Sequence, residues 1–353
     1  MSAPLHVLVV DDSAVVRQVM TALLGTEMTV TTAADPLIAM AKMETRRPDV
    51  IVLDLEMPRM DGLTFLRKLM DESPLPVVVC SSLTESSSEL TMKALLLGAV
   101  DVVLKPRVRM GEALSDSAIA LIDTVRAASQ ARVGRARSRR PAEPRRRLAM
   151  PKVPATGRSS AREVIAIGAS TGGTEALKLL LDAMPADAPP MVIVQHMPEH
   201  FTGAFARRLN ETSAMSVREA VEGDVVRPGT ALIAPGDRHI ALVWQGRGVL
   251  GIALHDGPLV NRHRPSVDVL FASAARTLGA SAVGVLMTGM GRDGAKGLLS
   301  MRKAGALTIA QDEASSIVFG MPRAAIELGA AGRVVAADRI GTELLEAVRG
   351  HNG

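Results

Sequence analysis

Aromatic residues and cysteine are the scarcest components of this sequence. Its 353 residues include one Trp, five Phe, no Tyr and a single Cys. Hydrophobic residues still make up 47% of the chain, so a core must be built from Val, Leu, Ile, Ala and Met, which suits an α/β architecture. Cys80 can form no intramolecular disulfide, and a reducing cytoplasm is its simplest setting.

Long apolar runs are missing as well. No stretch of about 18 apolar residues occurs, and the N-terminus has no basic region followed by an apolar one. We therefore expect neither export nor membrane insertion. The length is sufficient for two packed cores, and a mean hydropathy of +0.21 excludes disorder throughout the chain.

The positive charge is concentrated in one segment. The formal net charge is +4, but between residues 132 and 147 arginine occurs eight times against a single acid, Glu143. Prolines accompany the arginines and apolar periodicity is missing, so we predict a linker at 129–161 between domains at 1–128 and 162–350. Self-repulsion and solubility explain this charge most simply, and contact with an acidic partner or membrane surface is the alternative.

Apolar runs alternate with helical patterns on both sides of this linker. The repetition predicts a doubly wound parallel sheet in each domain, with three α/β/α layers in the second. Short apolar segments between residues 231 and 254 are broken by turns and predict antiparallel hairpins inserted in the second domain. The runs that we interpret as buried parallel strands are 6–10, 50–53, 77–80, 100–104, 164–167, 191–194, 282–287 and 306–310.

Polar residues follow the strand-like runs of the first domain: Asp11 and Asp12, Asp54, Ser81 and Lys105. In open α/β sheets, ligands bind beyond the carboxyl ends of the strands. Clustered carboxylates attract a hard cation such as Mg²⁺, which would neutralise an incoming phosphoryl group while one carboxylate acts as nucleophile. One charged residue at a strand end usually just faces water, but five together predict a site.

The segments 9–13, 53–62 and 105–106 resemble the signature of receiver domains. This resemblance implies a flavodoxin-like sheet in which Asp54 is the phosphoacceptor. It also implies that Ser81 and Lys105 bind the phosphoryl oxygens. The protein ligands of Mg²⁺ would then be Asp11, Asp12, Asp54 and the carbonyl of Glu56.

Three runs of the second domain end in Ser170, His196 and Asp293. A serine hydroxyl needs a base to take its proton, and the base needs an acceptor on its other nitrogen, so these residue types predict a hydrolase. A glycine-rich turn such as 168–173 can also cradle phosphates. However, its spacing differs from that of dinucleotide sites, and His196 stands where such a site needs an acid. The other histidines considered, His200, His239, His255 and His263, have no comparable placement and no metal-ligand spacing.

The segments 167–173, 194–198 and 287–294 closely resemble the CheB family of protein-glutamate methylesterases, and the order Ser, His, Asp departs from that of α/β-hydrolases. The resemblance implies a serine hydrolase that releases methanol from methylated glutamates and deamidates glutamines, without a cofactor for this reaction. Met290 N–H is our leading oxyanion donor, with an amide near Thr171 or His196 second, and Thr171 is a supporting residue.

The resemblance also implies partners and regulation. The unphosphorylated receiver would cover the hydrolase mouth, a CheA-type histidine kinase would phosphorylate it, and methyl-accepting chemoreceptors would be the substrate. A cytoplasmic chain recruited to receptor arrays, without nucleic-acid binding, is then expected. Two other classes stay open at this point: a receiver with a DNA- or nucleotide-binding output, and a catalytically silent interaction module.

Overall fold

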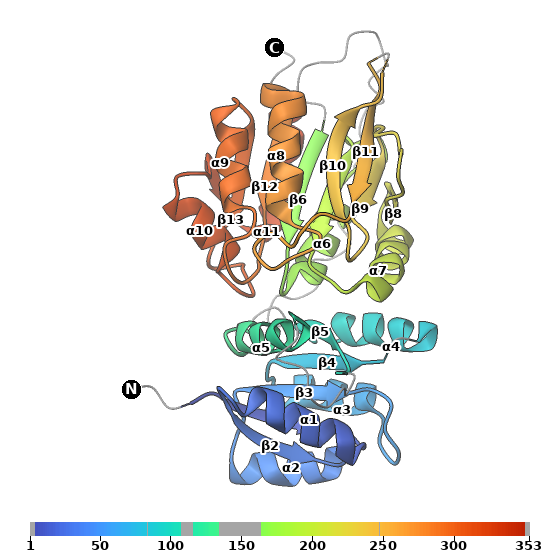
Figure 1. The fold of residues 1–353 in the computed structure, drawn as a ribbon, viewed down its shortest axis with the longest axis vertical. Helices are drawn as coiled ribbons and strands as arrows, with labels where there is room; N and C mark the ends of the chain where they lie inside the picture. The colour runs from blue at the N-terminus through green and yellow to red at the C-terminus, as the bar shows by residue number, and fades with distance from the viewer. Residues whose placement is uncertain (1–3, 83, 107–115, 134–163, 247, 350–353) are drawn as a thin grey trace.

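The computed structural model describes residues 4–82, 84–106, 116–133, 164–246 and 248–349. Two parallel sheets follow each other along the long axis of the molecule, and helices flank both (Figure 1). The predicted α/β class with two parallel sheets is confirmed. Most of the predicted linker, residues 134–161, lies outside the described residues.

The first sheet has five parallel strands in the order β2-β1-β3-β4-β5. Four of these strands match predicted apolar runs. No apolar run predicts β2, because its sequence TVTTA is rich in threonine and is only partly buried at the sheet edge. Ser13, Asp35 and Asp61 cap α1, α2 and α3, each accepting a bond from the amide three residues on. The elements are β1 (His6–Val10), α1 (Ala14–Leu24), β2 (Thr29–Ala33), α2 (Pro36–Thr45), β3 (Val50–Asp54), α3 (Gly62–Glu72), β4 (Val77–Ser81), α4 (Glu85–Leu96), β5 (Asp101–Leu104) and α5 (Asp116–Ser129).

The second sheet has seven parallel strands in the order β14-β13-β12-β6-β7-β9-β8. Contacts join α6 to α7 and α11 in one group and α8 to α9 in another, as expected for helices on both faces. The elements are β6 (Val164–Ala169), α6 (Gly173–Asp182), β7 (Met191–Gln195), α7 (Glu199–Thr212), β8 (Ser216–Glu219), β9 (Thr230–Ile233), β10 (His239–Trp244), β11 (Leu250–His255), α8 (Val267–Leu278), a 3₁₀ turn η1 (Gly279–Ser281), β12 (Ala282–Leu286), α9 (Ala295–Lys303), β13 (Leu307–Gln311), α10 (Met321–Glu327), β14 (Arg333–Val335) and α11 (Ala337–Arg349).

The prediction of several hairpins between residues 231 and 254 is partly wrong. The first segment of this region is β9, which pairs in parallel with β7 and β8 and so belongs to the main sheet. Among the strands of the described residues, only β10 and β11 pair antiparallel with each other. A short apolar run does not reveal its partner, because the same residues fit a parallel or an antiparallel neighbour.

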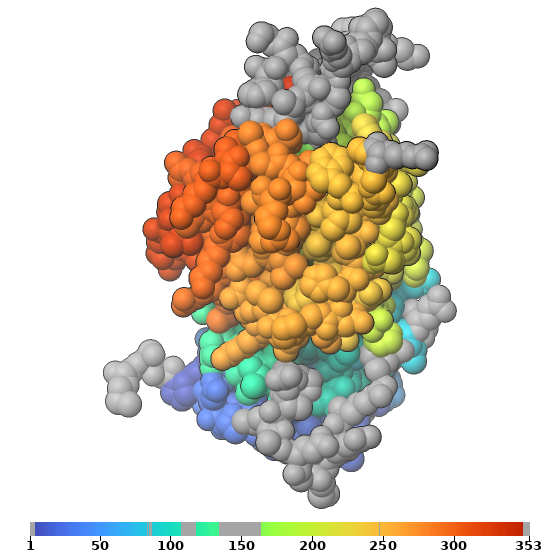
Figure 2. Space-filling model, turned by 45° about the horizontal axis from the view of Figure 1, so that its top comes forward, coloured from blue at the N-terminus to red at the C-terminus, as the bar shows by residue number. Residues whose placement is uncertain are grey.

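The two domains meet along α4, β5 and α5 of the first domain (Figure 1). Helix α4 packs against α7, and the Ser88 hydroxyl donates a hydrogen bond to the carbonyl of His200 at 3.1 Å. Ile317 of the second domain packs against the apolar core of the first. The space-filling view in Figure 2 shows the two parts of the chain in direct contact at this boundary.

None of the helices in the described part of the chain combines the length and the apolar character that crossing a bilayer requires.

Candidate functional site

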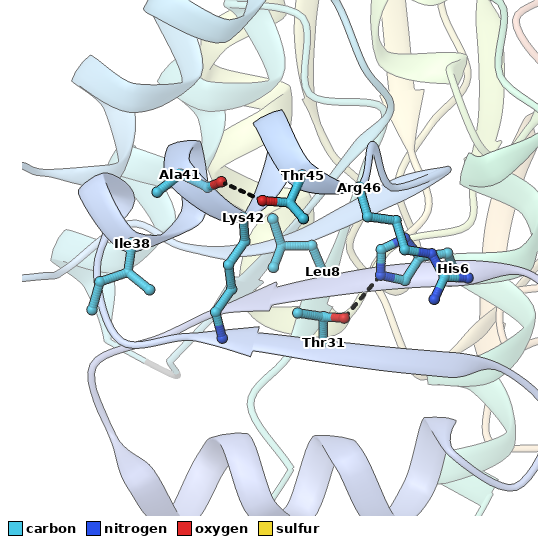
Figure 3. Close-up of a pocket in the computed structure, with 8 residues that line it drawn as sticks. All are labelled: His6, Leu8, Thr31, Ile38, Ala41, Lys42, Thr45 and Arg46. Atoms are coloured by element: carbon cyan, nitrogen blue, oxygen red, sulfur yellow. Dashed lines mark hydrogen bonds between the residues drawn. The ribbon is translucent and has the colours of Figure 1, made fainter.

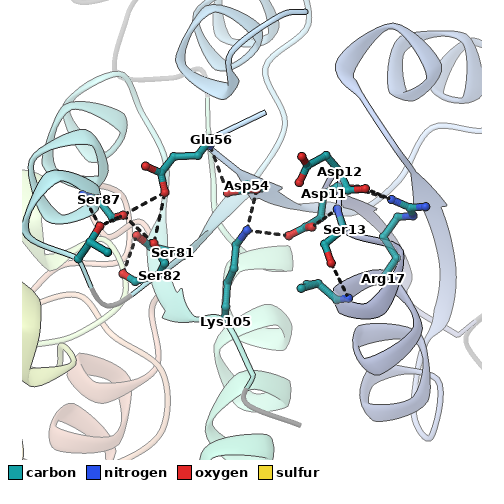
Figure 4. Close-up of polar contacts among 12 residues, drawn as sticks. Asp11, Asp12, Ser13, Arg17, Asp54, Glu56, Ser81, Ser82, Ser87 and Lys105 are labelled. Atoms are coloured by element: carbon teal, nitrogen blue, oxygen red, sulfur yellow. Dashed lines mark hydrogen bonds and ion pairs between the residues drawn. The ribbon is translucent and has the colours of Figure 1, made fainter. Parts of the chain in front are cut away.

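An acidic cluster lies at the carboxyl ends of β1 and β3 (Figure 4). One carboxylate oxygen from each of Asp11, Asp12 and Asp54 lies within 4.8 Å of the others. Lys105 closes the cluster, with its Nζ 2.7 Å from Asp54 Oδ2 and 3.2 Å from Asp11 Oδ2. The structure thus brings together four of the residues that the strand ends predict.

The electrostatics of this cluster favour a further cation. Burial raises the pKa of Asp54 above its usual range, although Lys105 acts in the opposite direction. For Lys105, burial works to lower the pKa, but the bond to Asp54 and the charges of Asp54 and Asp11 outweigh it and the pKa is raised. Asp11 Oδ2 is buried, and the Lys105 ammonium at 3.2 Å is its partner among the described residues. Oxygen ligands of this kind suit a hard divalent cation.

Ser81 and Glu56 lie at the edge of the same cluster (Figure 4). The Ser81 hydroxyl accepts a bond from Thr91 at 2.9 Å, and the Glu56 amide donates to Asp54 Oδ1 at 3.2 Å. Ser87 on α4 donates to the Glu56 carboxylate at 3.1 Å. Sequence reasoning missed Ser87 and Thr91, because neither stands at a strand end.

The second site lies where β6 and β7 end. Ala169 and Gln195 are paired across these two strands, so Ser170 and His196 follow as neighbours. The Gln195 side chain donates to the carbonyls of Ser170 at 2.9 Å and His196 at 3.1 Å and so ties the two turns together. Within the described residues, neither Ser170 Oγ nor His196 Nδ1 has a hydrogen-bond partner, and Nδ1 is buried.

Asp293 accepts a hydrogen bond from the other nitrogen of His196, with Nε2 2.9 Å from Oδ2. Burial alone would raise the pKa of Asp293, but the bond to His196, the charge of that ring and further bonds hold it well below the usual range. Those further donors are the Asn261 side chain at 2.7 Å, the Ser266 hydroxyl at 2.7 Å, and the amides of Val267 at 2.7 Å and Asp268 at 3.3 Å. The carboxylate is therefore ionised and fixed in place.

Close packing between β6 and α8 allows this arrangement. A Cβ atom on Gly168 would lie 2.2 Å from Cγ1 of Val267, so only glycine lets the start of α8 come this near to the strand. The Val267 amide then reaches Asp293. The glycine-rich turn that the sequence singles out thus also positions the carboxylate.

The loop that carries Met290 passes directly against Ser170. The Ser170 amide donates to Thr288 O at 3.0 Å, and a Cβ on Gly289 would lie 2.7 Å from Cβ of Ser170. The Gly289 carbonyl accepts bonds from Gly320 and Met321, at 3.0 and 2.7 Å. The Gly289 carbonyl and the Met290 N–H belong to the same trans peptide, in which C=O and N–H point in opposite directions. Because the carbonyl points toward Gly320 and Met321, the Met290 N–H points away from them. The His196 amide is already bonded to Ala169 O at 3.1 Å, which leaves it unsuited to bind an oxyanion.

One expectation about the histidines is wrong. His263 does have a special placement, because its ring stacks on that of His196 with centroids 3.7 Å apart and planes at 11°. Burial lowers the pKa of His263 to about 3, and the His196 ring adds to this effect. No sequence signal links His263 to His196, since the contact depends on the tertiary placement of the loop 257–266.

The first domain contributes two polar contacts beside Ser170. The Thr171 hydroxyl donates to Asp101 Oδ2 at 2.7 Å, and the Gly172 amide donates to Val100 O at 3.2 Å. Burial raises the pKa of Asp101 to about 6. Sequence reasoning missed Asp101, which stands at the start of a strand rather than at its end.

A hollow on the first domain is lined by residues of β1, β2 and α2 (Figure 3). His6 sits on its wall and its Nε2 lies 2.9 Å from the Thr31 hydroxyl. The hollow contains none of the predicted site residues. Its lining is His6, Leu8, Thr31, Ile38, Ala41, Lys42, Thr45 and Arg46.

Comparison with known proteins gives two family matches. Residues 165–344 match the CheB methylesterase family, and residues 7–114 match the response regulator receiver domain. A protein of Rhodospirillum rubrum named protein-glutamate methylesterase/protein-glutamine glutaminase 2 is 53% identical over 98% of this chain and 99% of its own. A protein of the same type from Anaeromyxobacter dehalogenans, numbered 5, is 54% identical over 98% of this chain and 97% of its own. The crystal structure of the Thermotoga maritima CheB methylesterase catalytic domain superposes with a TM-score of 0.52 at 39% identity, covering 53% of this chain and 98% of that one.

Proposed function

The chain belongs to the CheB methylesterase family and carries a receiver domain, and on this premise we propose how its residues hydrolyse receptor esters under control of phosphorylation. It is a protein-glutamate methylesterase and protein-glutamine glutaminase of chemotactic adaptation. Our proposal divides it into a receiver at 1–128, a linker at 129–161 and a catalytic domain at 162–350. Its location is cytoplasmic, at receptor arrays.

Ser170 is the nucleophile of this proposal. His196 Nδ1 takes the proton of the hydroxyl as Oγ attacks the γ-carbonyl of a methylated glutamate, while Asp293 on Nε2 stabilises the resulting imidazolium. The protonated ring then gives its proton to the departing methoxide, and methanol leaves. Water, deprotonated by His196, hydrolyses the acyl-enzyme and regenerates Ser170. A glutamine reacts in the same way with loss of ammonia.

The developing oxyanion needs donors aimed at its position. Met290 N–H suits this role because hydrogen bonds from Gly320 and Met321 hold the carbonyl of the same peptide, Gly289 C=O, so that the N–H points away from them. The Thr171 amide, at the start of the turn before α6, is the second donor. Its hydroxyl supports the site by orienting this turn.

The receiver controls access. Asp54 accepts the phosphoryl group from a CheA-type histidine kinase, and Ser81 and Lys105 bind its oxygens. A Mg²⁺ ion held by Asp11, Asp12, Asp54 and the Glu56 carbonyl would neutralise the charge of the incoming group when bound. The fit of these residues to the ion rests on carboxylate oxygens of Asp11, Asp12 and Asp54 that lie within 4.8 Å of one another, because Mg²⁺ prefers such oxygen ligands.

In the unphosphorylated packing, receiver groups occupy donors next to the nucleophile. Asp101 accepts from the Thr171 hydroxyl and Val100 accepts from the Gly172 amide, so a receptor helix has no access to this turn. Phosphorylation shifts the population toward the separated domains and frees the turn.

The observation that carries the catalytic assignment is the buried His196 ring. Nε2 of this ring is fixed on Asp293, and Nδ1 has no partner among the described residues. His196 follows β7 directly, as Ser170 follows the neighbouring β6. A buried polar atom without a partner costs stability, and a catalytic role explains why such an atom is retained here.

The test is methanol release from methylated chemoreceptor membranes by the wild type, Ser170→Ala and Ser300→Ala, each with and without a small phosphodonor and Mg²⁺. Ser300 is an exposed serine of α9 and serves as the matched control. We expect Ser170→Ala to lose about 10⁴-fold or more in rate and Ser300→Ala to match the wild type, with release rising on phosphorylation. Equal release by Ser170→Ala would contradict the assignment, and no release by any form would favour a silent interaction module.

A further inference from the structure

A tight turn at residues 260–263 contacts two of the three proposed catalytic residues. Val260 and His263 exchange two backbone hydrogen bonds, at 3.1 and 2.9 Å. The two central residues, Asn261 and Arg262, have φ angles of 51° and 67°. Two positive φ values define a type I′ turn, and a non-glycine residue such as arginine rarely adopts this conformation. Such a strained backbone persists only where surrounding contacts hold it in place. Strained residues of this kind are common at functional sites.

The first contact of the turn is with the carboxylate. Asn261 Nδ2 donates to Asp293 Oδ1 at 2.7 Å and to Asp268 Oδ2 at 2.8 Å. Asp268 in turn accepts from the Gly297 amide at 2.6 Å, at the start of α9. Asn261 therefore bridges Asp293 to a second, independently held carboxylate.

The second contact is with the base. The His263 ring lies flat on His196, with centroids 3.7 Å apart and planes 11° from parallel. A face-to-face contact leaves the edge of His196, with both nitrogens, free to bond Asp293 on one side and Ser170 on the other. It also blocks rotation of the ring out of its plane.

The charge state of His263 suits this position. The charged and titratable groups that face it are His196, Asp293 and Arg262. Because burial lowers its pKa to about 3, His263 stays neutral at every pH at which the esterase would be assayed. A neutral π face beside His196 does not repel the imidazolium that forms during the reaction, and it attracts that cation electrostatically.

We propose that His263 is a positioning residue of the hydrolase, which holds the His196 ring plane through their stack, while Asn261 of the same turn fixes Asp293. This inference rests on the proposed function, because it assigns a task to the base of that reaction. A displacement of a catalytic group by about 1 Å can cost on the order of 10²-fold in rate. The stack therefore acts on the chemical step and leaves substrate binding nearly unchanged.

The experiment uses the full chain with phosphodonor, Mg²⁺ and methylated receptor membranes, and compares His263→Phe, His263→Leu and His255→Ala. Phe keeps a π face, Leu fills the space without one, and His255 is an exposed histidine of the same domain that serves as control. We expect His263→Leu to lower kcat by about 10- to 100-fold with KM within about threefold of wild type, and His263→Phe to recover kcat to within about threefold.

Equal kcat for the Leu and Phe variants, or a change confined to KM, would overturn the proposal. Thermal unfolding of both variants separates a folding defect from the expected effect, since both fill the site with an apolar side chain. Ser170→Ala in the same assay distinguishes a failure of the proposed function from a failure of the role proposed for His263. If it stays active, the proposed function fails, whereas if it is inactive and His263→Leu is fully active, only the role of His263 fails.

Discussion

Acidification should drive the two domains together. The group responsible is the Asp101 carboxylate of the receiver, which accepts a 2.7 Å hydrogen bond from Thr171 beside the nucleophile. The groups that face it are the Thr171 hydroxyl, the Val102 amide and the His196 ring, and burial outweighs them to raise its pKa from 3.8 to about 6. Docking therefore favours the protonated form of this carboxyl.

The direction and size of the pH effect on the docking free energy follow from proton linkage. In separated domains Asp101 is exposed and has a pKa of about 4, so between about pH 4 and pH 6 the docked state binds more protons. Docking strengthens as the pH falls through about 6, and the gain is complete below about 4. Between about pH 7.5 and pH 5 the docking free energy improves by ~1.4 kcal/mol, which is a factor of about ten in the docking equilibrium.

The measurement is energy transfer between dyes on Leu37→Cys in the receiver and Val221→Cys in the catalytic domain. Both positions are exposed, and Cys80 does not compete for the label because burial raises the pKa of its thiol. Asp101→Asn is the matched control, since the amide oxygen still accepts from Thr171 but carries no charge and does not titrate.

In the wild type we expect the docked fraction to rise on acidification, and in Asp101→Asn we expect it to be high and independent of pH. A wild type that does not respond, or an Asp101→Asn chain that responds equally, would refute the role of this carboxyl.

Two further predictions concern the separate sites. Asp293→Asn should lower methanol release by about 10⁴-fold, because an amide no longer fixes the tautomer of His196, and it should leave KM nearly unchanged; a loss below about tenfold would contradict the role of the carboxylate. Asp54→Asn should take up no phosphoryl group from a small phosphodonor, seen as an unchanged mass, and its methanol release should not rise with phosphodonor and Mg²⁺; uptake on another residue would contradict the assignment of the phosphoacceptor.

Much of both sites could be predicted from the sequence because most of the key residues directly follow an apolar run. Asp11, Asp54, Ser170 and His196 directly end or follow buried strands, and parallel strands bring such residues to one edge of a sheet. The strands without an apolar run were not predictable in this way. β2, β8 and β14 lie at or beside sheet edges, have polar or half-buried residues, and depend on a neighbour for their pairing.

The residues that surround the predicted ones were decided by tertiary structure. Asn261 and His263 reach Asp293 and His196 from a turn in which Arg262 has a positive φ that arginine rarely adopts, and the stacked rings are 67 positions apart in the chain. Asp101 meets Thr171 only through the packing of one domain on the other. Local sequence determines which atoms stand at the end of a strand, because backbone geometry and burial act over a few residues. Contacts between distant segments depend on how completed elements pack, and that is a property of the whole fold.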